Sequence, residues 1–97
     1  MEESSMPLRT DPVMVTPRLI AVREALGLNK AEFADRIGID RSSYTKIEKA
    51  EKPLLPQFAF RIWELWGVDM NYIYLGRLDN LPGHLSEKVT NRLTARN

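Results

Sequence analysis

Residues 28–48 read LNKAEFADRIGIDRSSYTKIE, and this stretch decides the fold. An apolar-periodic segment runs up to Gly38, and after a short turn comes Asp40, a good helix N-cap. The segment that follows is polar except at Tyr44 and Ile47, which share one helix face because they lie three residues apart. Two short helices joined at a glycine, the second mostly polar, predict a helix-turn-helix. The second helix of that motif lies outside and can enter a DNA major groove.

A helix is predicted before this stretch, and it ends at Gly27. Thr16 is a good N-cap and Pro17 suits the first helical position, so we expect the helix to start there. Leu19 and Val22 share one face of this helix and are expected to point into the core.

Two more helices are predicted after the stretch. Pro56 opens the first, which ends at Gly67, and Asp69 caps a short second one, which ends at Gly76. The core stripe of the first, at i, i+4 and i+8, is Phe58, Ile62 and Trp66. Because no segment alternates as a strand does, the predicted fold class is all-α, a compact five-helix domain.

We expect one domain at residues 16–76 with a tail at each end. Residues 1–15 contain two prolines among acidic and small polar residues, which favours a flexible N-terminal arm. Residues 77–97 read as a linker followed by either a weak helix from Ser86 or a frayed C-terminal tail.

The composition excludes several kinds of site. The chain has 97 residues and no cysteine, which rules out disulfides and thiolate metal sites. His84 is the only histidine, so a histidine metal cluster is not available, and no nucleophile with its base can be recognised. We therefore expect no metal, no cofactor and no enzymatic activity.

Charge and hydropathy limit the class of partner. The formal net charge is only +1, so any basic surface for nucleic acid must be local. No apolar run approaches the roughly 18 residues that a membrane span needs, and the first residues do not form a signal peptide. Together with the lack of cysteine, this leads us to expect a cytoplasmic protein.

At the quoted stretch the chain resembles the lambda-repressor-like helix-turn-helix family of phage repressors, Cro proteins and xenobiotic-response-element-type bacterial regulators. The resemblance covers about residues 16–76. The spaced positions that carry it are Ala34, Gly38, Tyr44, Ile47 and Glu48. The resemblance implies a five-helix domain that binds double-stranded DNA with the predicted helix at 40–49.

The resemblance also implies which residues touch DNA. Base contacts fall near the start of that helix and one turn later, at Arg41, Ser42 and Lys46, with Thr45 beside them. Arg41 has the geometry to bond a guanine through two hydrogen bonds. The expected phosphate contacts, which position the protein without reading sequence, are Asn29, Lys30, Ser43, Lys49 and Lys52.

Three further positions follow from the resemblance. Arg23 and Glu48 match positions that often form a partly buried ion pair between the first and third helices. The family commonly has glutamine where this chain has Lys30, and lysine retains only the phosphate contact. It usually has glycine where this chain has Ala50, so we expect the third helix to end differently or to run longer.

Large apolar residues in the last third of the domain suggest a second copy as a partner. Related domains often dimerise around the fourth and fifth helices. The candidate interface residues are Phe60, Trp63, Met70, Tyr72 and Tyr74. The alternative is that the C-terminal tail packs over Phe60 and Trp63.

The sequence therefore predicts a dimeric, sequence-specific DNA-binding regulator, a phage or bacterial repressor. A protein-interaction module such as an antitoxin or accessory factor is the alternative, and the nearly neutral charge favours it. Charged helix residues are also often a plain solvated face, and only the surrounding motif makes Arg41 and Lys46 candidates for contact.

Overall fold

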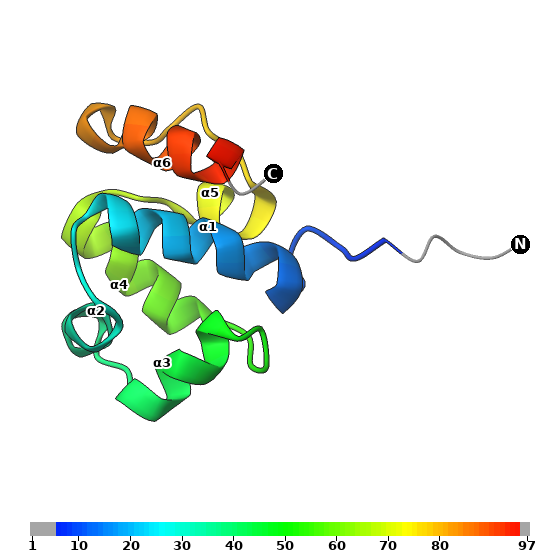
Figure 1. Ribbon diagram of the computed structural model, residues 1–97, viewed down its shortest axis with the longest axis vertical. Helices are drawn as coiled ribbons and strands as arrows, with labels where there is room; N and C mark the ends of the chain where they lie inside the picture. The colour runs from blue at the N-terminus through cyan, green and yellow to red at the C-terminus, as the bar shows by residue number, and fades with distance from the viewer. Residues whose placement is uncertain (1–5, 96–97) are drawn as a thin grey trace, which may run out of the picture.

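The computed structural model describes residues 6–95, and in this range the chain forms six α-helices and no strand. The helices are α1 (Pro12–Ala25), α2 (Lys30–Ile37), α3 (Arg41–Glu48), α4 (Pro56–Trp66), α5 (Met70–Leu75) and α6 (Gly83–Ala95). Helix α1 runs through the middle, with α2, α3 and α4 on one side and α6 on the other (Figure 1). The all-α prediction is confirmed. Within the described part of the chain, no helix has the length and apolar character to cross a membrane.

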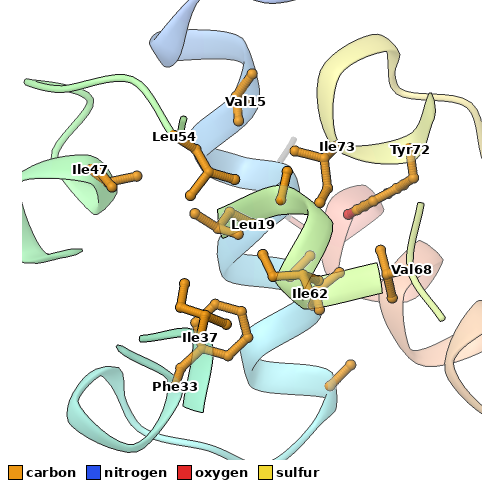
Figure 2. Close-up of a cluster of buried hydrophobic side chains, with 14 of the residues drawn as sticks. Val15, Leu19, Phe33, Ile37, Ile47, Leu54, Ile62, Val68, Tyr72 and Ile73 are labelled. Atoms are coloured by element: carbon orange, nitrogen blue, oxygen red, sulfur yellow. The ribbon is translucent and has the colours of Figure 1, made fainter. Parts of the chain in front are cut away.

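One apolar core joins all six helices. Leu19 of α1, Phe33 of α2, Ile62 of α4 and Ile73 of α5 are fully buried, and they converge from their separate helices (Figure 2). The Phe33 ring stacks on Trp66, with centroids 5.1 Å apart and the planes within 9°. Such ring pairs add to the free energy gained by burial. The inward faces predicted for α1 and α4 are confirmed.

Helix α1 starts earlier than its sequence predicts. Its N-cap is Asp11 and its first residue is Pro12, so the prediction that Thr16 caps a helix starting at Pro17 is wrong. Val15 explains the extra turn, because it is buried and lies four residues before Leu19 on the same face. Residues 12–15, predicted as part of the flexible arm, are therefore helical.

Thr16 has a different part in the fold. Its hydroxyl is buried and donates a hydrogen bond of 2.7 Å to the carbonyl oxygen of Ile47, near the end of α3. A buried hydroxyl needs such a partner. The bond links α1 to the C-terminal end of the second helix of the helix-turn-helix.

The C-terminal segment forms a well-packed helix. Helix α6 begins at Gly83, before the predicted Ser86, and buries Leu85 and Val89. It packs along α1 (Figure 1). The alternative in which this segment covers Phe60 and Trp63 is wrong, since these two side chains remain 47% and 48% exposed.

Candidate nucleic-acid interface

Three caps set the position of the helix-turn-helix. The Asn29 side chain accepts a hydrogen bond of 2.8 Å from the backbone of Glu32, whose carboxylate accepts one of 2.9 Å from the Asn29 backbone. This is the capping box that the sequence predicts. Gly38 ends α2 with φ 80°, a left-handed conformation that glycine adopts without steric cost. Asp40 then caps α3 by accepting from the Ser43 backbone at 3.0 Å.

Helix α3 has one buried face and one exposed face. Tyr44 and Ile47 lie in the core, as predicted, and Ala34 of α2 is fully buried. A small residue at this position allows α2 and α3 to cross closely. On the outer face, Arg41 and Lys46 are exposed to solvent. The polar side of α3 is therefore available to a partner.

A buried polar network holds α3 against α1. Arg23 donates from Nε to Glu48 Oε2 at 2.6 Å and from Nη2 to Glu48 Oε1 at 3.2 Å, so the predicted ion pair is present. The Tyr44 hydroxyl donates to Glu48 Oε2 at 2.5 Å, and Arg23 Nη1 donates to the Leu28 carbonyl at 3.0 Å. Burial lowers the pKa of Arg23 while the bonds to Glu48 raise it, and the net direction is upward. Because the partners come from three places in the chain, the network fixes how α3 lies in the domain.

The end of α3 differs from what its sequence predicts. Helix α3 stops at Glu48, and Ala50 takes a left-handed conformation with φ 61°. The Ala50 and Glu51 backbone N–H groups donate to the carbonyls of Ile47 and Lys46 at 3.0 and 2.9 Å. These two bonds form a Schellman motif. The expectation of a changed or longer helix is therefore wrong, because alanine accepts the strained conformation in which glycine is usual.

Two of the three side chains predicted to read bases, Arg41 and Ser42, already have partners within the domain. Arg41 donates from Nε and Nη2 to the two carboxylate oxygens of Asp35 on α2, at 3.0 and 2.6 Å. This bond lowers the pKa of Asp35 and raises that of Arg41. Ser42 donates to Asp40 at 2.5 Å, and its hydrogen bond is the main reason that the pKa of Asp40 is lowered. Contacts within the domain thus fix the positions of two side chains on the outer face of α3.

The other predicted contact residues lie around this face. Lys49 follows α3 and is exposed, as are Asn29 and Lys30 at the start of α2. Lys52 Nζ lies 3.4 Å from Ser43 Oγ, which brings the loop after α3 back to its first turn. Thr45 is half-buried, and its hydroxyl donates to the Arg41 carbonyl at 3.1 Å, so this side chain is turned along the helix.

A family model described as helix-turn-helix matches residues 19–73, more than half of the chain. The chain belongs to the lambda-repressor/Cro-like helix-turn-helix family. Among curated proteins and among solved structures, none matches it. Membership makes the protein a DNA-binding helix-turn-helix regulator, in a family that is generally non-enzymatic.

One predicted interface residue of this helix-turn-helix protein is in the core. Tyr72 is 1% exposed and its hydroxyl donates to the Arg18 carbonyl at 2.7 Å, so the prediction that it contacts a second copy is wrong. Burial raises the pKa of Tyr72. Tyr74 is half-buried and donates to the Leu54 carbonyl at 2.6 Å, which directs its polar end inward. Its side chain helps to hold the loop before α4 in place.

The remaining candidates form an apolar patch on α4 and α5. Phe60 and Trp63 are about half exposed, with ring centroids 5.5 Å apart. With Met70 and Asp69 they line a shallow hollow of about 260 Å³. Neither this hollow nor any other part of residues 6–95 has a cluster of histidine and carboxylate side chains that could hold a metal ion.

Asp35 is the residue of the interface that sequence reasoning missed. It lies six residues before Arg41, on the preceding helix, so no periodicity within one helix links the two. A signal was present nevertheless. An acidic residue in the last turn of α2 lies near the start of α3 in a helix-turn-helix, because the turn between them is short.

Proposed function

We propose that this protein is a repressor that reads a specific double-stranded DNA sequence with α3 and acts as a homodimer. The observation that carries this proposal is the exposed face of α3, with Arg41, Ser42 and Lys46, on a helix held by the Arg23–Glu48 network. A recognition helix must present its base-reading side chains in one orientation. Such a protein acts in the cytoplasm, where its DNA target lies.

Arg41 is the residue we assign to direct base recognition. Asp35 occupies its Nε and Nη2 groups, which leaves the second guanidinium edge, with Nη1, directed away from the carboxylate. That edge can donate two hydrogen bonds to O6 and N7 of guanine, a contact worth about 1–3 kcal/mol of discrimination. Asp35 then keeps the guanidinium plane in position for the base pair.

The phosphate contacts follow from the same placement. Asn29 and Lys30 lie at the start of α2, where backbone N–H groups and the helix dipole favour a phosphate. Lys49 follows the last turn of α3, whereas the Lys52 side chain returns to its first turn, and both are exposed. Contacts on both sides of the recognition helix would fix its register on the duplex without reading sequence.

Dimerisation is proposed through Phe60, Trp63 and Met70. Large aromatic side chains that are half exposed and adjacent favour burial against a partner. A two-fold pair would use the same patch from both copies and present two α3 helices to half-sites about one helical turn apart. Because the net charge is only +1, two linked domains would supply the affinity that one lacks.

The experiment is selection of bound oligonucleotides from a random pool, followed by titration of the selected site. We expect an enriched, near-palindromic site, and Arg41→Ala should lose about one to two orders of magnitude in affinity for it. Arg61→Ala is the matched control, because Arg61 is also exposed but lies on α4 with Glu64 as its partner. If no sequence is enriched, or both variants bind the site equally well, sequence-specific reading through Arg41 is wrong.

A protein-interaction module, such as an antitoxin, is the second candidate. The nearly neutral charge and the exposed Phe60 and Trp63 favour it. In that case co-purification from the native host would yield a stoichiometric protein partner whose binding is lost in Trp63→Glu, while the selection from random DNA would enrich nothing.

A further inference from the structure

A second concave site lies on a different part of the domain from α3. An open cleft of about 540 Å³ is bounded by the first half of α1, the residues that follow α5, and α6. Its lining includes Val13, Met14, Leu78 and Leu93, with Arg18 and Gly76. This volume falls within the range of small-molecule sites, which is about 300–1,000 Å³.

Arg18 is a buried cation in this cleft. Only 9% of the residue is exposed, and its Nη1 donates to the carbonyl oxygens of Ile73 and Arg9, each at 2.9 Å. Within residues 6–95, no carboxylate forms a hydrogen bond or ion pair with this guanidinium. Burial lowers the pKa of Arg18, Tyr72 partly opposes this, and the charge of Arg9 lowers the pKa further. Arginine stays charged at neutral pH all the same, and no carboxylate of residues 6–95 compensates this positive charge.

Two donors of Arg18, Nε and Nη2, have no acceptor among the described residues. Every fully buried side-chain nitrogen in the described range has a hydrogen-bond partner, and both acceptors of Arg18 are reached by Nη1. Nε and Nη2 are therefore not fully buried, and Arg18 lines the cleft. Gly76 leaves room beside them, since a Cβ at that position would lie 3.2 Å from Nε and Nη2.

We propose that this cleft binds a small monocarboxylate with an apolar body. Nε and Nη2 of a guanidinium form a fork whose spacing matches the two oxygens of a carboxylate. One negative charge balances one buried positive charge, whereas a doubly charged phosphate would leave charge uncompensated. The apolar body would lie on Val13, Met14 and Leu78, which are partly or largely exposed.

Titration of the ¹⁵N-labelled full chain with octanoate, followed by NMR, tests the proposal, with 1-octanol as the uncharged probe of equal chain length. We expect saturable shifts of the backbone amides of Val13, Gly76 and Leu78. Octanol should bind at least about tenfold more weakly. Its uncharged hydroxyl has one oxygen, so it cannot accept the pair of hydrogen bonds that the guanidinium donates to a carboxylate. Equal binding of the two probes, or shifts confined to Phe60 and Trp63, would overturn the proposal.

A pair of variants tests the location without removing Arg18 from the fold. Leu78→Glu places a carboxylate at the mouth of the cleft and should abolish octanoate binding by occupying Arg18. Leu65→Glu makes the same change on α4, at a side chain of similar exposure, and should bind octanoate as the natural protein does. If Leu78→Glu binds octanoate within a factor of about two of the Leu65→Glu variant, the cleft is not the site.

Discussion

Arg23 and Glu48 form a two-bond fork, at 2.6 and 3.2 Å, that joins α1 to the last residue of α3. Their side chains are only 12% and 3% exposed. The Tyr44 hydroxyl supplies a third hydrogen bond to the same carboxylate. The orientation of α3 in the domain therefore depends on a carboxylate that water barely reaches.

Glu48→Ala should lower the free energy of unfolding by about 3–5 kcal/mol, because it leaves the Arg23 charge buried without its partner. Urea unfolding followed by circular dichroism measures this. Glu51→Ala is the control, since Glu51 is exposed, and we expect a change within about 0.5 kcal/mol. A loss below about 1 kcal/mol for Glu48→Ala would show that water reaches and solvates Arg23 in solution.

The same network predicts a loss of stability at alkaline pH. Burial, and then the bond to Glu48, raises the pKa of Tyr44 above its ordinary value of about 10. Below pH 10 both folded and unfolded chains keep the proton, so the full stability is present. Above pH 10 the unfolded chain loses the proton first, and stability falls by up to about 1.4 kcal/mol per pH unit for this tyrosine.

Tyr44→Phe should remove this tyrosine's part of the fall in unfolding free energy above pH 10. The variant also loses the hydrogen bond to Glu48 at neutral pH. Unfolding free energies of both proteins between pH 8 and about pH 11 provide the test, since other titrating groups act on both alike. If the unfolding free energies of the two proteins fall equally with rising pH, Tyr44 is not the cause of the loss of stability at alkaline pH.

Ala50→Gly should stabilise the protein. Ala50 has φ 61°, and a left-handed conformation costs an alanine about 1–2 kcal/mol, more than glycine loses in unfolded-chain entropy. We expect a gain of up to about 1 kcal/mol and a rise in Tm of several degrees. The matched control is Ala31→Gly inside α2, where the same change should cost about 1 kcal/mol. Losses of equal size in both variants would contradict the strain at Ala50.

Helices α2 to α5 were predictable because each carries a local signal at its start or its end. The capping box at Asn29 and Glu32 and the cap at Asp40 act within four residues, and the structure has them all. The start of α1 was not predictable from such signals. Thr16-Pro17 is as good a helix start as Asp11-Pro12, and only the tertiary contacts of Val15 and Thr16 decide between them.

The candidate site was predictable to a similar extent. The resemblance named Arg23, Glu48 and the outer residues of α3, and the structure has the ion pair and the exposed face. It did not provide Asp35, because two residues on different helices meet only after the turn is formed. Tyr72 was misassigned for a related reason, since an aromatic side chain in a short helix carries no signal that separates core from surface.

Trp63→Glu should produce a monomer and weaken binding to a two-half-site operator by about two orders of magnitude or more, since the second domain would no longer be held nearby. Sedimentation velocity and operator titration measure the two effects. Leu65→Glu, equally drastic but outside the aromatic pair, should remain dimeric. A natural protein that sediments as a monomer, alone and on its operator, would refute dimerisation through this patch.

Asp35→Asn separates two effects of the Asp35–Arg41 fork. Removing a negative charge next to DNA weakens repulsion of the phosphates, so affinity for unrelated DNA should rise, more at low salt than at high salt. The asparagine amide holds the guanidinium less firmly than a carboxylate that accepts two bonds, at 3.0 and 2.6 Å, so discrimination at the guanine should fall. We expect the ratio of specific to non-specific affinity to drop by about threefold to tenfold. Asp79→Asn is the control, because its carboxylate pairs with Arg77 after α5, remote in sequence from the helix-turn-helix. If Asp35→Asn instead tightens binding to the selected site and to unrelated DNA by the same factor, Asp35 acts only through its charge and does not position Arg41.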